Sequence, residues 1–176
     1  MKKLIIIFAA MVMMAAFTTK VMAQKSTMAF TSTAPNDARA EVLSSIGLTA
    51  VNPLEFGGLS SGASGTVILT PLGIRTATGG VTLLATNITP TAASYTMTGA
   101  MNTLYFITLP TTPQIITRVG NSATMSVQTF TCSYPTLSHL IDVSGTDAFT
   151  VGATLVVGAS QLSGTYTGSF DVTVAY

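Results

Sequence analysis

The amino-acid sequence predicts an all-β protein, an antiparallel β-sandwich or barrel preceded by a signal peptide. From residue 54 onward, short apolar or alternating runs are separated by Gly, Pro and Asn. The runs have the length of strands, and the helices that an α/β fold needs between its strands are not indicated. Charged residues make up only 7% of the chain, and a hydroxyl-rich surface of this kind suits an exported β protein.

Residues 1–23 have the pattern of a secretory signal peptide. Lys2 and Lys3 precede a nearly uninterrupted apolar run over residues 4–17, and we expect cleavage after Ala23. That run is short for a bilayer, and no second run of about 18 apolar residues follows, so no membrane-spanning segment is expected after cleavage. We therefore expect the protein in the periplasm, at the cell surface or outside the cell.

The mature chain divides into an N-terminal extension, residues 24–40, and one β-sandwich domain, residues 41–176. In the extension Met28 and Phe30 are two residues apart and share one face of an extended segment. Pro35 and the residue after it interrupt the pattern. The extension is therefore a candidate donor strand, with Met28 and Phe30 as its apolar side chains.

Eight strands are expected in the domain. The alternation over residues 42–50 favours a first strand, with a short helical turn over residues 37–43 as the alternative. The other strands are expected over residues 65–70, 80–86, 94–98, 103–109, 123–131, 149–157 and 165–176.

Turn residues punctuate these strands. Gly79-Gly80 predicts a tight hairpin turn, and Leu109-Pro110 predicts the end of a strand because proline cannot donate to the ladder. Residues 119–122 and 142–147 read as further turns, and the glycine-rich residues 62–66 read as a loop. The carboxylates of Asp142 and Asp147 are thereby interpreted as turn formers.

Groups that could carry catalysis or hold a metal are scarce. Cys132 and His139 are the sole residues of their types, so a closed zinc site cannot form. We interpret Cys132 as a small buried side chain and His139 as a polar loop residue. From residue 42 onward, Asp142 and Asp147 are the only close pair of acids, and they fall in an expected surface turn. The sequence thus predicts neither an enzyme nor a cofactor.

The charge balance of residues 24–176 disfavours nucleic acid as a partner. Four cations stand against six carboxylates, a formal charge of 4 − 6 = −2. No basic cluster is present to neutralise phosphates.

The last segment alternates up to its final residue, with apolar side chains at Phe170, Val172, Val174 and Tyr176. Two interpretations are open. The strand is central to a complete sandwich, with Gly164 and Gly168 shaping a bend or bulge, or a partner recognises it by edge pairing.

Several motifs resemble those of an uncharacterised family of small secreted bacterial proteins, a domain of unknown function (4402). The motifs are Pro53-Leu54-Glu55-Phe56-Gly57, Gly65-Thr66-Val67-Ile68-Leu69, Pro71-x-Gly73-x-Arg75, Gly79-Gly80-Val81, Val151-Gly152-Ala153-Thr154-Leu155 and Gly164-Thr165-Tyr166-Thr167-Gly168-x-Phe170-x-Val172-x-Val174-x-Tyr176. The resemblance covers residues 45–176.

The closing segment is also similar to that of the spore coat U domain pilins, subunits of archaic chaperone–usher pili. Those subunits end in Gly-x-Tyr, an alternating strand and a terminal aromatic residue, as residues 164–176 do. The resemblance implies an immunoglobulin-like, pilin-like antiparallel β-sandwich that is exported to the periplasm and polymerises by donor-strand exchange. Those domains commonly carry paired cysteines, whereas this chain has only Cys132.

These observations lead to two expected functions. The first is an exported, non-enzymatic structural or adhesive surface protein, a pilus-like subunit whose partners are other copies of itself and a periplasmic chaperone and usher. Its chaperone or subunit contacts would be the four apolar residues of the terminal strand. The alternative is a monomeric secreted module that binds a ligand such as carbohydrate through Tyr95, Tyr105 or Tyr134.

Overall fold

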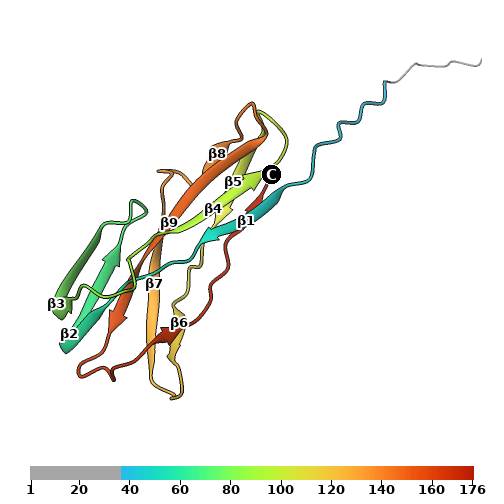
Figure 1. Cartoon of the computed structure of the whole chain (residues 1–176). Coiled ribbons are helices and arrows are strands. Elements are labelled where there is room, and N and C mark those ends of the chain that lie inside the picture. Colours follow the sequence, from blue (N-terminus) through green and yellow to red (C-terminus); the bar gives the residue numbers. More distant parts are fainter. Residues whose placement is uncertain (1–36) are drawn as a thin grey trace, which may run out of the picture. The chain divides into compact units, whose positions relative to one another are not determined.

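The computed structural model describes residues 37–176, and Glu41–Tyr176 forms a compact unit. Within the described residues there are eleven strands and no helix (Figure 1). The predicted all-β, antiparallel, sandwich-like fold is confirmed. The expected signal peptide and the candidate donor residues Met28 and Phe30 lie outside the described residues.

The strands form two antiparallel sheets. The eight-stranded sheet has the order β1-β4-β9-β7-β6-β10, with β2 paired to both β9 and β3, and the three-stranded sheet has the order β11-β5-β8. The strand bounds are β1 (Gly47–Asn52), β2 (Leu59–Leu69), β3 (Arg75–Leu83), β4 (Ala93–Thr98), β5 (Leu104–Thr108), β6 (Gln114–Arg118), β7 (Thr124–Cys132), β8 (Ser138–Leu140), β9 (Thr146–Val157), β10 (Tyr166–Thr167) and β11 (Thr173–Ala175).

Strand β9 connects the two halves of the large sheet. Its first half pairs with β4 and its second half with β2, while β7 pairs along the other edge. Apolar residues alternate along it with a period of two, from Phe149 to Val157, and all of them are buried. That period is the one by which successive strand side chains face opposite sides of a sheet.

The buried apolar residues form two clusters. The enclosed core lies where the three-stranded sheet covers the large sheet, and it consists of Ala93, Met97, Tyr105, Ile107, Leu109, Ile141, Phe149 and Val151. The groove-side core consists of Phe56, Val67, Leu69, Val81, Met125, Val127, Ala153, Leu155 and Val157. No residue of β5, β8 or β11 belongs to the groove-side core, so the large sheet curls around it without a second sheet to cover it.

Two glycine-rich predictions are wrong. Gly79-Gly80 is not a hairpin turn but lies inside β3, and residues 62–66 are not a loop but part of β2. Gly79 has a φ of +68° and faces Gly65, where a Cβ on Gly79 would lie 2.5 Å from the Ser64 carbonyl oxygen. These glycines therefore allow a β-bulge at which the backbones of β2 and β3 approach closely. The hairpin turns instead at residues 70–74, where the Thr70 amide donates to the Ile74 carbonyl.

Other expected elements are placed as follows. The first strand starts at Gly47 rather than at residue 42, and residues 37–46 contain neither strand nor helical turn. The strand end before Pro110 and the turn at residues 119–122 are confirmed. Strands β6 and β8 were not expected: β8 has only three residues, and in β6 two adjacent isoleucines obscure the alternation.

The last expected strand, residues 165–176, is divided between the two sheets. Strand β10 pairs with β6 of the large sheet, and β11 pairs with β5 of the small sheet. The chain crosses between them at Gly168, where a Cβ would lie 2.7 Å from the Ile115 carbonyl oxygen. Both β10 and β11 are edge strands of the described sheets, so the interpretation of a central final strand is wrong.

Candidate functional site

A groove of about 1030 Å³ opens over the groove-side core. One wall is formed by residues 50–61 and the other by residues 161–170. Its floor contains buried residues of that core, among them Phe56, Met125 and Leu155. A part of the hydrophobic core thus forms the bottom of an open groove, a concave and mostly apolar surface of the kind at which ligands bind.

The first wall is held in place by the guanidinium of Arg75. Its Nη1 donates to the Phe56 carbonyl (2.6 Å) and to the Gly58 carbonyl (2.9 Å), and its Nη2 donates to the Leu84 carbonyl (3.2 Å). A planar guanidinium with several donors suits such a cluster of acceptors. Arg75 therefore fixes a wall segment that belongs to no strand at residues 56–58.

The second wall is held by three side chains. The Gln161 amide donates to the Thr124 carbonyl (3.1 Å) and to the Tyr166 hydroxyl (2.8 Å), and that hydroxyl donates to the Leu162 carbonyl (2.7 Å). Arg118 Nε donates to the Ser163 carbonyl (2.7 Å). Side-chain hydrogen bonds thus tie both walls of the groove to strands of the large sheet.

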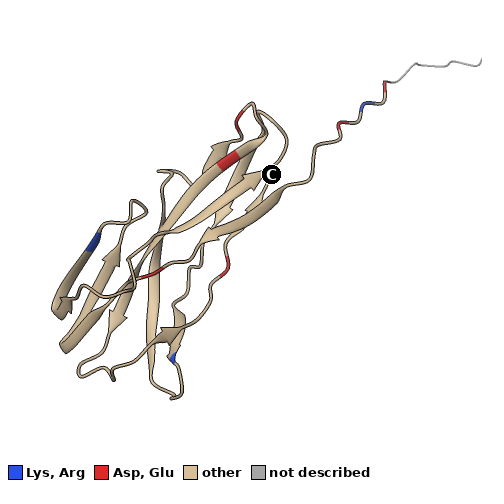
Figure 2. Ribbon diagram, viewed as in Figure 1, with Lys and Arg blue, Asp and Glu red and all other residues tan. Residues whose placement is uncertain are grey.

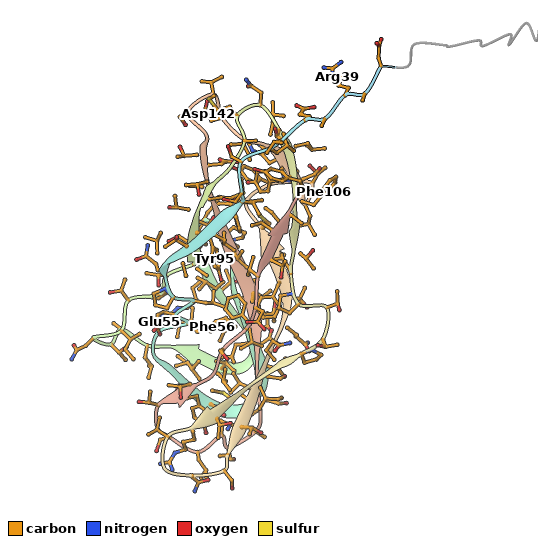
Figure 3. The ribbon with its side chains drawn as sticks, turned by 90° about the vertical axis from the view of Figure 1, so that its right-hand side faces the viewer. Arg39, Glu55, Phe56, Tyr95, Phe106 and Asp142 are labelled. Atoms are coloured by element: carbon orange, nitrogen blue, oxygen red, sulfur yellow. The ribbon has the colours of Figure 1, made fainter. Side chains whose placement is uncertain are left out.

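The groove is nearly free of charge. Figure 2 shows how widely the charged residues are spaced over the domain, and Glu55 is the one charged residue that lines the groove. Glu55 lies beside Phe56 (Figure 3) and forms no ion pair with any residue between 37 and 176. Strand β10, in the other wall, has a strand partner on one side only among the described strands. The groove thus has an apolar floor, and one of its walls contains an edge strand.

The terminal segment turns its apolar side chains toward its own domain. Phe170, Val172 and Val174 are half-buried against the enclosed core, whereas the residues between them are exposed. Tyr176 is 39% exposed, and its hydroxyl accepts a hydrogen bond from the Ala100 amide (2.6 Å) and donates to the Ser44 carbonyl (3.0 Å). A partner that approached this segment would therefore meet the backbone edge of β11, while the four predicted contact side chains are already engaged.

Replacing Tyr176 by Phe tests the role of this terminal hydroxyl. We expect the free energy of unfolding to fall by about 1 kcal/mol, because two hydrogen bonds are lost, with the yield of exported protein close to that of the wild type. Urea unfolding and quantification of the periplasmic fraction measure the two quantities. Loss of export at unchanged stability would instead identify the hydroxyl as a partner contact.

A polar cluster links the two sheets around Asp147. Its carboxylate accepts hydrogen bonds from the hydroxyls of Tyr105 (2.9 Å) and Tyr134 (2.7 Å), and it lies 2.8 Å from Nδ1 of His139. Asp147 belongs to β9 of the large sheet, whereas Tyr105 and His139 belong to the small sheet. The prediction that Asp147 forms a turn is therefore wrong, and so is the prediction that His139 is a loop residue.

The cluster shifts the pKa values of its members in opposite directions. Burial would raise the pKa of Asp147, but hydrogen bonds from Tyr134, His139 and Tyr105 outweigh burial and hold this pKa below its ordinary value. Burial, followed by the hydrogen bond to Asp147, raises the pKa of Tyr105 and of Tyr134. The carboxylate is therefore the charged member and the tyrosines are its neutral donors, which makes the cluster a clamp between the sheets.

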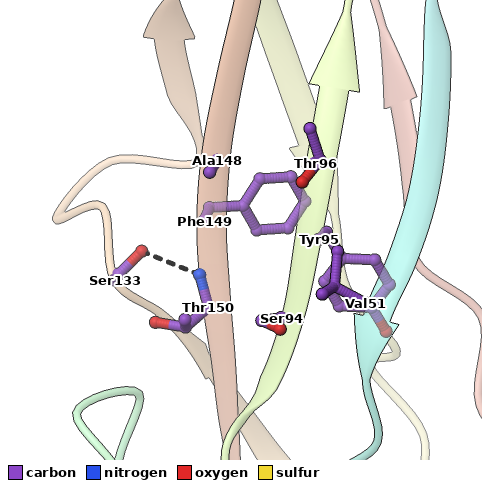
Figure 4. Close-up of a pocket in the computed structure, with 8 residues that line it drawn as sticks. All are labelled: Val51, Ser94, Tyr95, Thr96, Ser133, Ala148, Phe149 and Thr150. Carbon is purple, nitrogen blue, oxygen red and sulfur yellow. Dashed lines mark hydrogen bonds between the residues drawn. The ribbon is translucent and has the colours of Figure 1, made fainter.

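A smaller hollow of about 370 Å³ lies over β4 and β9 (Figure 4). Its lining combines hydroxyl groups with the rings of Tyr95 and Phe149, which stack with centroids 5.2 Å apart. Tyr105 is fully buried, and the ring of Tyr134 stacks on His139 at 3.8 Å. Because these tyrosine faces already pack within the protein, they offer little to the alternative of carbohydrate binding.

The remaining candidates for chemistry add no site. Cys132, interpreted from the sequence as a buried side chain, is only half-buried and packs against the enclosed core. Between residues 37 and 176, no group of three or more His, Cys, Asp or Glu side chains is placed to hold a metal ion. In the same part of the chain, no helix is long and apolar enough to cross a membrane.

The fold and the groove define an all-β, sandwich-like domain whose core is open along one side. The chain belongs to the family described as Domain of unknown function (DUF4402), which matches residues 46–176. Neither a curated protein nor a solved structure matches the chain.

Proposed function

We propose that this protein is an exported, non-enzymatic structural subunit that assembles by donor-strand exchange: the N-terminal extension of one copy fills the groove of another. The observation that carries the proposal is the open groove with buried core residues on its floor. In this mode of binding, backbone hydrogen bonds to a free edge give affinity and alternating side chains give specificity. The signal-like residues 1–23 support export.

The point at which the chain enters the domain favours exchange between copies. The Ser44 carbonyl is bound by Tyr176, whose hydroxyl also binds Ala100, and none of Ser44, Ala100 and Tyr176 lines the groove. The groove runs from Ala50 in β1 to Gln114 and Ile116 in β6, and β6 lies toward the other end of the domain in Figure 1. An extension that filled its own groove would have to run back along the domain, whereas one from another copy need not.

Assembly is tested on material sheared from cells that express the chain together with its neighbouring genes. We expect a ladder of multimers on an unboiled gel that collapses to monomer on boiling, because a strand inserted into a core dissociates slowly. A chain without residues 24–36 serves as the control and should give monomer only. Monomer alone from the wild-type chain would overturn the proposal.

A further inference from the structure

We infer that the groove receives residues 25–31 of a second copy in a single register, with Lys25 beside Glu55 and with Met28 and Phe30 on the apolar floor. This inference rests on the proposed function, and it names the partner segment. The segment has seven residues, fewer than the ten residues, 161–170, that line one wall of the groove.

The apolar pattern of the extension defines which residues face the floor. Between residues 24 and 36 the only large apolar side chains are Met28 and Phe30, and they are two residues apart. In an extended strand both point to the same side. The floor that they would meet contains Phe56, Met125 and Leu155, so apolar side chains cover an apolar surface. Pro35 lacks an amide donor and limits the inserted segment on its C-terminal side.

Charge complementarity fixes the register. Glu55 is the one charged residue of the groove lining and has no cationic partner among residues 37–176, while Lys25 is the one cation between residues 24 and 36. Lys25 lies three residues before Met28, so it points to the rim when Met28 points to the floor. Its flexible apolar stem can follow the wall and bring the ammonium to the carboxylate. A shift of the strand by one residue would bury polar side chains and separate this pair.

Charge reversal tests the pairing. Glu55→Lys places two cations together and Lys25→Glu places two carboxylates together, so each variant alone should polymerise at least about tenfold less than the wild type. Mixing the two single variants should restore polymer, because each groove then meets an extension of opposite charge. The double variant Lys25→Glu/Glu55→Lys should also polymerise. The polymerised fraction is measured by sedimentation of the full mature chains.

Matched controls separate pairing from general charge and from folding. Glu41→Lys and Arg39→Glu make the same charge changes at exposed residues outside the groove and should assemble as the wild type does. Glu55 pairs with Thr91 only through its backbone amide and carbonyl. Glu55→Lys should therefore keep the unfolding midpoint of the monomer.

The possible results distinguish this inference from the proposed function. Suppose that the wild-type chain polymerises. If the single variants polymerise equally well, or if their mixture stays monomeric, the proposed register is wrong, whereas the proposed donor-strand assembly is not affected. If the wild-type chain stays monomeric, a synthetic peptide of residues 24–36 is added to the full chain. The register is supported if the wild-type peptide binds wild-type chains and the Lys25→Glu peptide binds Glu55→Lys chains instead. Absence of binding overturns the register.

Discussion

Deleting residues 171–176 is expected to remove folded protein almost completely. The deletion takes away β11, which pairs with β5, together with Val172, Val174 and the Tyr176 side chain that binds Ser44 and Ala100. Fully burying a valine side chain contributes about 1.5–3 kcal/mol; the two half-buried valines contribute part of this each, and the lost strand pairing and hydrogen bonds add to it. The total approaches the 5–15 kcal/mol by which a typical domain is stable. The yield of soluble mature protein and its urea midpoint measure the effect.

Two double variants test the inward-facing and the exposed side chains of the terminal segment separately, without shortening the chain. Val172→Ser/Val174→Ser changes side chains that pack on the enclosed core, and we expect a loss of about 2 kcal/mol or more. Thr173→Ser/Ala175→Ser changes neighbouring residues that are exposed, and we expect almost no effect. Equal effects of the two pairs, or a truncated chain with wild-type stability, would show that this segment serves a partner rather than its own fold.

The alternation of the terminal segment predicted which side chains face inward but not which strands they join. Phe170, Val172 and Val174 do face the core, as a period of two requires. The division of the segment between two sheets depends on the pairing of β10 with β6 and of β11 with β5. Periodicity determines only which side chains share a face of a strand. It does not determine the sheet to which the strand belongs. For the same reason, the sequence did not predict that one half of the domain has no covering sheet, and so it did not predict the groove.

The residues that hold the groove and the clamp follow no sequence motif. Arg75 binds carbonyls 17 and 19 residues away, and Tyr105 binds Asp147 across 42 residues. The one feature of the sequence that could have indicated these residues is the scarcity of charged side chains in the chain. In a chain with so few charges, Arg75, Arg118 and Asp147 are not needed to cover a surface, and each of them makes a specific hydrogen bond. In charge-poor sequences, a lone charged residue is thus a reasonable candidate for a structural hydrogen-bond centre.

Replacing Asp147 by Ala is expected to lower the free energy of unfolding by about 3 kcal/mol. The substitution removes the acceptor of Tyr105, whose side chain is fully buried, and of Tyr134, and a hydrogen bond to a charged group contributes about 1.5–3 kcal/mol. It also removes the hydrogen bonds between β9 and the small sheet, while the enclosed core still packs between them. Asp142→Ala, in an exposed turn, is the control and should cost about 0.5 kcal/mol or less.

The pH dependence of this loss identifies the ionised carboxylate as its cause. The pKa of Asp147 is lower in the folded protein than its ordinary value of 3.8, so its charge stabilises the fold above that pH. This contribution is lost as the pH falls through the lower, folded pKa. Urea unfolding should therefore show the full difference between wild type and Asp147→Ala at about pH 7 and a smaller one at about pH 3. A difference that stays constant over this range would mean that packing of the side chain, and not its charge, holds the two sheets together.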